Sequence, residues 1–165
     1  VIGGSFTSRL NMNLREDKSW SYGVRARLSS RKGPRPMLVY APVQTDRTVD
    51  SIKEIQKEYS EYLSSRPASN EEIDPIKQQI ILGLNGQFET FGSLLSGVSG
   101  IVTFERGDDY LNAVPEIYNS VTIDQVNAAA EKYLDPETWT WFIVLLIKTK
   151  NKKNPSIEGF LILKL

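Results

Sequence analysis

The spacing of apolar residues along the chain predicts several amphipathic helices. The clearest helical period lies in residues 48–64, where every third or fourth residue is apolar. The expected buried residues of this helix are Val49, Ile52, Ile55, Tyr59 and Leu63. The expected solvent-facing residues are Lys53, Glu54, Lys57, Glu58 and Glu61. A narrower stripe of Phe6, Leu10 and Leu14 predicts a helix over residues 5–18, with Ser5 or Thr7 as its cap.

Alternating and β-branched segments predict three strands, over residues 22–29, 37–43 and 138–147. The pair Gly33-Pro34 between the first two strands predicts a turn, so these two strands would form a hairpin. The third segment is apolar enough to lie centrally in a sheet. Residues 160–165 become apolar again, and either an extra strand or a poorly ordered end fits this pattern.

Capping signals and glycines set the helix boundaries in the middle of the chain. Capping boxes over residues 69–72 and 122–125 predict helices that begin there. Glycines within residues 82–90 predict a break, and the small residues of a helix over 91–105 would allow close packing. With a short helix over 110–120, the order of elements predicts an α+β fold with helices on one face of a mostly antiparallel sheet.

Composition removes several classes of site. The 165 residues include 20 basic and 20 acidic residues, so the formal charge is zero and no broad attraction to nucleic acid or anionic membrane is expected. The chain has no cysteine and no histidine, which excludes a thiolate nucleophile, a zinc–sulfur site and a Ser-His triad. The apolar run 142–147 is far shorter than the ~20 residues of a membrane span. Both the bacterial periplasm and the cytoplasm stay open as locations, and no metal site is expected on this chain.

The stretch from Gly3 to Gly23, GGSFTSRLNMNLREDKSWSYG, carries the candidate chemistry. Arg15 would lie near the end of a helix and Tyr22 at the start of the following strand. Both side chains donate hydrogen bonds and can hold a peptide group, but neither can hydrolyse one alone. The plainer alternative is a surface arginine and a tyrosine that packs on a hairpin. Gly3 and Gly4 either allow a close backbone approach or form a simple loop.

This opening stretch resembles the second, zinc-free domain of the pitrilysin/insulinase family of metallopeptidases, which includes the mitochondrial processing peptidase. The resemblance extends over residues 1–145. It is supported by an ordered set of motifs: Ser8-Arg9-Leu10, Leu14-Arg15-Glu16, Ser21-Tyr22-Gly23, Asn70-Glu71-Glu72-Ile73, Phe88-Glu89-Thr90 and Tyr133-Leu134-Asp135-Pro136. It implies the metallopeptidase-half fold (LuxS/processing-peptidase-like).

The resemblance also implies a function. Members pair two similar halves, in one chain or in two subunits, and one half holds zinc through an inverted HxxEH motif. The other half contributes an Arg–Tyr pair to an extended peptide substrate, and Arg15 and Tyr22 match that pair. This chain would therefore be a non-catalytic, substrate-binding half that needs a zinc-bearing partner domain or subunit, in cis or in trans. Alone it would be inactive.

The likeness ends after Val144, so residues 146–165 are expected to form an atypical tail beside a domain over 1–145. The start at Val1, without Met, favours an N-terminally truncated fragment. Two other functions fit the same residues. One is a structural core subunit of a larger complex, with no proteolytic role. The other is an independent peptide-binding module.

Overall fold

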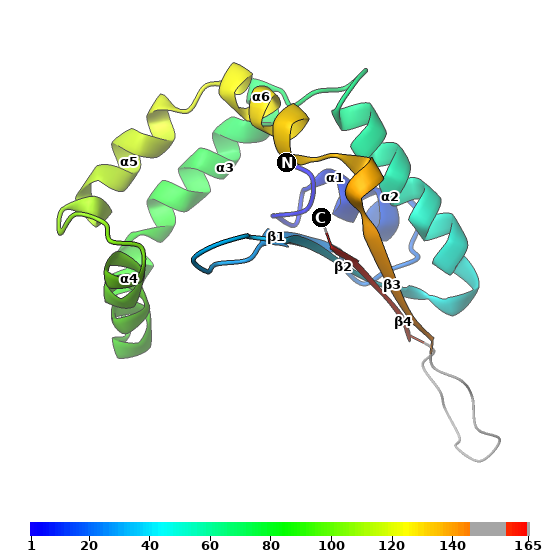
Figure 1. The fold of residues 1–165 in the computed structure, drawn as a ribbon, viewed down its shortest axis with the longest axis horizontal. Helices are drawn as coiled ribbons and strands as arrows, with labels where there is room; N and C mark the ends of the chain where they lie inside the picture. Colours follow the sequence, from blue (N-terminus) through cyan, green and yellow to red (C-terminus); the bar gives the residue numbers. More distant parts are fainter. Residues whose placement is uncertain (146–157, 165) are drawn as a thin grey trace, which may run out of the picture. The chain divides into compact units, whose positions relative to one another are not determined.

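Four antiparallel strands form one sheet in the order β1-β2-β4-β3. The computed structural model describes residues 1–145 and 158–164, and Figure 1 shows the strands together with the helices. The strands are β1 (Arg25–Leu28), β2 (Met37–Gln44), β3 (Thr140–Leu145) and β4 (Glu158–Lys164). Residues 1–67 and 129–165 form one unit, which holds this sheet, and residues 68–128 form a second, helical unit.

One face of the sheet is buried against the N-terminal helices of the same unit. Val39, Ala41 and Val43 alternate along β2 and are buried, as is Ala26 on β1. Figure 1 shows α1 (Arg9–Asn11) and α2 (Thr48–Tyr62) on the same side of this sheet. Their buried side chains include Leu10 of α1 and Ile55 and Tyr59 of α2, so the core lies between these helices and the sheet. This α+β arrangement confirms the predicted fold class.

The predicted helix over residues 5–18 is shorter at its start and changes its winding. It begins at Arg9, and its second part, η1 (Met12–Asp17), is a π-helix. Ser5 and Thr7 do not cap it, because the N–H groups of Arg9 and Leu10 donate to the carbonyl oxygens of Val1 and Ile2 instead. The N-terminal residues thus take the role that the prediction gave to a capping side chain.

Strand β3 is not central, which corrects the prediction for the segment after Thr138. Among the described strands β3 pairs only with β4, and the residues Phe142, Ile143 and Val144 are exposed. The apolar end of the chain supplies the inner strand: β4 pairs with β2 on one side and with β3 on the other. Of the two alternatives for residues 160–165, the strand is therefore correct for 160–164. The rest of the predicted tail, residues 146–157 and 165, lies outside the described residues.

Two residues of α2 differ from the predicted helix faces. Val49 is exposed because it lies in the first turn, and Glu58 is buried although it was expected to face solvent. The Glu58 carboxylate can be buried because it is paired with Arg66. The strand predicted over 22–29 begins only at Arg25, and Ser21 makes a single bridge to Val43.

The second unit consists of helices at the predicted positions. They are α3 (Asn70–Gly83), η3 (Asn85–Phe88), α4 (Phe91–Thr103), α5 (Tyr110–Ser120) and α6 (Ile123–Tyr133), the last of which continues into the first unit. Both capping boxes are confirmed, with Ser69 N–H on Glu72 and Thr122 N–H on Gln125. The expected close packing of the Gly/Ser-rich helix is wrong for the described chain, since no residue of α4 is buried. Short 3-10 turns complete the described elements of the first unit: η2 (Thr45–Arg47) and η4 (Pro136–Thr138).

Candidate functional site

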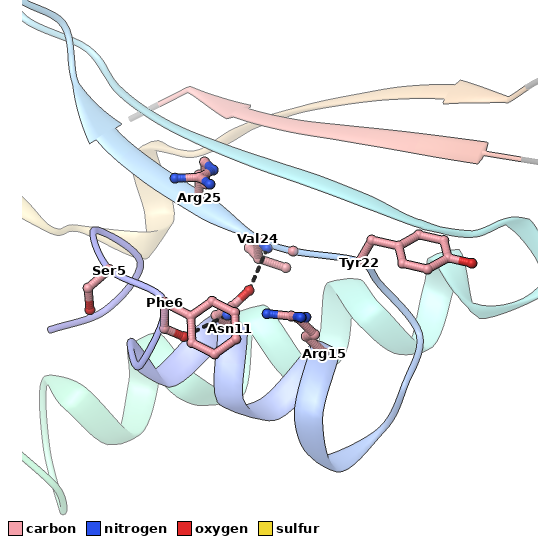
Figure 2. A pocket seen from close by; sticks show the side chains of 8 residues that line it. Ser5, Phe6, Asn11, Arg15, Tyr22, Val24 and Arg25 are labelled. Atoms are coloured by element: carbon pink, nitrogen blue, oxygen red, sulfur yellow. Dashed lines mark hydrogen bonds between the residues drawn. The ribbon is translucent and has the colours of Figure 1, made fainter.

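A pocket of about 210 Å³ lies beside the N-terminal helix and the start of β1. Figure 2 shows that the N-terminal loop, the helix and the segment leading into β1 all contribute side chains to it. The lining residues are Ser5, Phe6, Asn11, Arg15, Tyr22, Gly23, Val24 and Arg25. Two of them are arginines and none is acidic, so the pocket favours a ligand that accepts hydrogen bonds or carries negative charge.

Asn11 joins the two walls of the pocket. Its buried side chain donates from Nδ2 to the carbonyl oxygen of Phe6 at 2.6 Å, and its Oδ1 accepts from the N–H of Val24 at 3.0 Å. Figure 2 draws both bonds. Because buried backbone groups need partners, this one amide fixes the N-terminal loop against the segment that enters β1.

Arg15 reaches the pocket from the π-helix η1. Its guanidinium carbon lies 4.2 Å from the centre of the Phe6 ring, and its Nε lies 3.5 Å from the carboxylate of Glu16. The side chain is 34% exposed, so its remaining donors can meet a ligand. Leu14, the preceding residue, is fully buried and sets the orientation of this turn. Single π-helical turns often occur at functional sites.

Polar contacts with α2 hold the helix that carries Arg15. The Nδ2 group of Asn13 donates to Glu54 at 2.9 Å and to Glu58 at 2.8 Å, and Lys18 pairs with Glu54 at 3.3 Å. The other oxygen of Glu58 pairs with Arg66, so both oxygens of this buried carboxylate have partners. Burial raises the pKa of Glu54, but the hydrogen bond from Asn13 and the nearby charge of Lys18 outweigh it and leave the pKa lowered.

Tyr22 lines the pocket from the segment that leads into β1, and its side chain is 95% exposed. The turn before it is well fixed: Ser19 has a left-handed backbone with φ of 53°, and the hydroxyl of Ser21 donates to the carbonyl oxygen of Pro42 at 2.6 Å. The N–H of Gln44 donates to the carbonyl oxygen of Trp20 at 2.9 Å. The backbone of Tyr22 is therefore held at the end of β2, while its phenol extends into solvent.

The structure places Arg15 and Tyr22 at one pocket but not in contact. Within the described residues no hydrogen bond or ring contact joins the two side chains, and the Tyr22 ring points away from the guanidinium in Figure 2. Both groups are hydrogen-bond donors toward a bound molecule. The arrangement can hold a carbonyl or carboxylate, and it offers no general base.

Gly3 makes the close backbone approach that the sequence left open. Its carbonyl oxygen accepts from the N–H of Ala26 at 2.7 Å, and a Cβ on Gly3 would lie 2.6 Å from the Cβ of Ala26. Only glycine fits this contact, which fastens the N-terminal segment to β1 beside the pocket. Gly4 has open space around it and is an ordinary loop residue.

The side chains that could hold a metal do not gather anywhere in the described parts of the chain. Within residues 1–145 and 158–164, no group of three or more Asp, Glu, His or Cys residues could bind a metal ion. A catalytic zinc ion takes at least three protein ligands of these kinds, and the described residues bring no such set together. In the same residues, no helix is both long and apolar enough to cross a membrane.

Arg15 and Tyr22, the two residues predicted from the sequence, both line this pocket, but several other lining residues were not predicted. Asn11 lies one helical turn before Arg15, and the helical period puts both on one polar face, but its bonds to the backbone of Phe6 and Val24 were not predicted. Only a weak indication in the sequence pointed to Arg25 as exposed, namely that it precedes Ala26 in a segment of alternating polarity. The ring of Phe6, expected in the core, is instead 61% exposed beneath Arg15.

Comparison with known proteins identifies the kind of fold. The family described as peptidase M16 inactive domain matches residues 1–80. A crystal structure of a peptidase M16 inactive domain from Pseudomonas fluorescens superposes with a TM-score of 0.67 at 22% identity, over 82% of this chain and 32% of that one. The periplasmic protease PqqL from Escherichia coli gives a TM-score of 0.60 at 22% identity, over 76% of this chain and 14% of that one. No curated protein matches the sequence. This chain thus spans a third or less of the solved chains that it resembles.

Proposed function

Because residues 1–80 match the peptidase M16 inactive-domain family, we propose that this chain is the substrate-binding half of a zinc metallopeptidase. In this proposal Arg15 and Tyr22 hold an extended peptide, and a partner domain or subunit supplies the zinc. The observation that supports it most is that Arg15 and Tyr22, seven positions apart, line a single pocket without carboxylates.

The two side chains have complementary tasks. The fixed, permanently charged guanidinium of Arg15 donates to a peptide carbonyl oxygen on which negative charge develops. The neutral hydroxyl of Tyr22 donates to the same oxygen or to a neighbouring carbonyl, and its ring can turn toward the pocket because it is exposed. The Phe6 ring and the Asn11 amide act as positioning groups, since they support Arg15 and the wall of the pocket.

The test combines this chain with the zinc-bearing half that assembles with it and measures hydrolysis of fluorescein-labelled, unfolded casein. The chain alone should be inactive, and a chelator should abolish the activity of the assembly. Arg15→Ala should lower kcat/KM about 10- to 100-fold. Arg47→Ala is the matched control, because Arg47 is also a partly exposed arginine in an ion pair but lies outside the pocket. Equal kcat/KM for wild type and Arg15→Ala would refute the assigned role.

A structural subunit of a larger assembly is the second candidate function. One observation favours it: α4 carries several exposed apolar residues, namely Phe91, Leu94, Leu95, Val98 and Val102. Such a helix face is typical of a surface that is covered in an assembly. This alternative predicts an assembly with no hydrolysis of labelled casein, whatever residue stands at position 15.

A further inference from the structure

The basic residues of this chain are unevenly distributed. Although 20 basic residues balance 20 acidic ones overall, residues 18–45 contain six basic residues and no acidic residue. Five of the six lie in the β1–β2 hairpin and are exposed: Arg25, Arg27, Arg31, Lys32 and Arg35. The hairpin therefore concentrates positive charge on a neutral chain.

Arg25 and Arg27 are the two cations fixed within the strand β1. Ala26 between them is buried in the core, so the arginines share the opposite, exposed face of the strand. Arg25 lies opposite Tyr40 on β2, and Arg27 lies opposite Leu38. No ion pair of the described residues includes either arginine, so both guanidinium groups can meet an anionic ligand.

The arginines of the connecting turn are arranged differently. The Nε of Arg31 donates to the carbonyl oxygen of Pro34 at 2.9 Å, and the Nε of Arg35 donates to the carbonyl oxygen of Arg31 at 3.1 Å. These contacts fold the two side chains onto the turn, where Gly33 has a φ of 84°. The turn arginines therefore only increase the positive charge of the hairpin. Arg25 and Arg27 also place two charges at the fixed spacing of a strand.

The positive face of β1 is continuous with the candidate site. Arg25 lines the pocket together with Arg15 and Tyr22. Among the described strands β1 is at the end of the sheet, where an extended peptide can run alongside it. In an extended chain, residues two apart point to one face and lie about 6.6 to 6.8 Å apart. Arg25 and Arg27 have the same spacing, because they are also two apart on a strand.

We propose that Arg25 and Arg27 select peptides with two acidic residues at positions i and i+2, next to the segment that Arg15 and Tyr22 hold. This inference rests on the proposed function and names its substrate class. Each carboxylate can accept two parallel hydrogen bonds from one guanidinium. A peptide fits better than a phosphate polymer, because the exposed ring of Tyr40 lies opposite Arg25 on the same face of the hairpin and adds apolar surface beside the cations.

The test compares three labelled peptides of equal length, which differ only in containing Glu-Ala-Glu, Glu-Glu-Ala or Gln-Ala-Gln beside the scissile segment. The assembled peptidase cleaves each peptide at about 0.05 M and about 1 M salt, which screen exposed charges weakly and strongly. The enzyme forms are wild type, the double variant Arg25→Gln/Arg27→Gln, and Arg47→Gln as an exposed-arginine control. Each exposed ion pair should change kcat/KM about two- to fivefold.

At low salt, wild type should cleave the Glu-Ala-Glu peptide about tenfold faster in kcat/KM than the Gln-Ala-Gln peptide, and about threefold faster than the Glu-Glu-Ala peptide. These ratios should fall toward one at high salt and in the double variant, and should persist in Arg47→Gln. Equal rates for the three peptides, in an assembly that Arg15→Ala impairs, would overturn this inference alone. If the double variant still prefers the Glu-Ala-Glu peptide, this inference is also overturned.

Two further outcomes would overturn the inference in different ways. If Arg15→Ala has no effect on any peptide, or if the assembly cleaves none, the proposed function fails and this inference fails with it. Binding of single-stranded RNA or phosphatidylserine vesicles that the double variant abolishes, without discrimination among the three peptides, would assign the hairpin to a polyanion and overturn the peptide class.

Discussion

The π-helix η1 and helix α4 are held in opposite ways. Leu14 of η1 is fully buried, and Asn13 of η1 donates hydrogen bonds to two carboxylates of α2. Helix α4 has no buried residue, and its Leu95 is 59% exposed. The segment that presents Arg15 is therefore fixed by both apolar and polar contacts, while the apolar side chains of α4 add little to the stability of the described chain.

The contrast between η1 and α4 indicates that the helix carrying Arg15 is already held in place before any ligand binds. A side chain that holds a peptide group acts best when its support does not have to reorganise on binding. Arg15 has such support: the adjacent Leu14 is buried, the Phe6 ring contacts its guanidinium, and Asn13 donates a hydrogen bond to α2. Substitutions in the two helices test this contrast, and the largest expected change in stability is at Leu14.

Leu14→Ala should cost about 2–5 kcal/mol of the free energy of unfolding, because it leaves a cavity beneath the helix that carries Arg15. Leu95→Ala is the matched control on α4 and should change that free energy by less than about 0.5 kcal/mol. Urea denaturation followed by circular dichroism measures both. Comparable losses for the two variants would contradict the contrast between the helices.

Asn11→Ala should cost about 1–3 kcal/mol, since it leaves the N–H of Val24 and the carbonyl oxygen of Phe6 without their partner. Asn119→Ala, at an exposed position of α5, should be close to neutral. The same urea titration applies. A neutral Asn11→Ala would mean that the amide does not hold the wall of the pocket.

Several of these features follow from the sequence, and others depend on long-range contacts. The apolar period of residues 48–64 and the capping boxes predict their helices, because helix formation is governed by neighbouring residues. The central position predicted for β3 is wrong because strand order depends on which distant segment pairs with β2, and β4 fulfils that role.

Some features of the candidate site could likewise be predicted from the sequence, and others depend on contacts between distant residues. Arg15 and Tyr22 follow from the resemblance to a family, and their common pocket is a property of the fold. The burial of Glu58 could not be predicted from a helical wheel, because the wheel contains neither Asn13 nor Arg66. Likewise, the N-terminal residues satisfy the first turn of α1, so a local capping rule misplaced the start of that helix.

Acidification should weaken the attachment of η1 modestly. The folded-state pKa of Glu54 is lowered from its ordinary value of 4.5, so its contribution to stability is complete above that value and is lost as pH falls through the folded pKa. Solvent screening limits the effect to less than about 1 kcal/mol. Glu54→Gln should make the free energy of unfolding less dependent on pH as the pH falls below 4.5. An unchanged acid limb in this variant would rule out the role given to Glu54.

Substitutions of Arg15 and Tyr22 should change the free energy of unfolding very little and should change kcat/KM most. Arg15→Ala, Tyr22→Phe and the double variant should each alter the free energy of unfolding by less than about 0.5 kcal/mol, because both side chains lie at the surface. Tyr133→Phe, at another exposed tyrosine, is the control for Tyr22→Phe.

The most direct test is therefore a double-mutant cycle on kcat/KM of the assembled peptidase. If Arg15 and Tyr22 hold one peptide, each single variant should lower kcat/KM by about 10-fold or more, and the double variant should lose less than the product of the two effects. Unchanged kcat/KM in Arg15→Ala and Tyr22→Phe, with hydrolysis intact, would contradict the claim that this pocket binds the substrate.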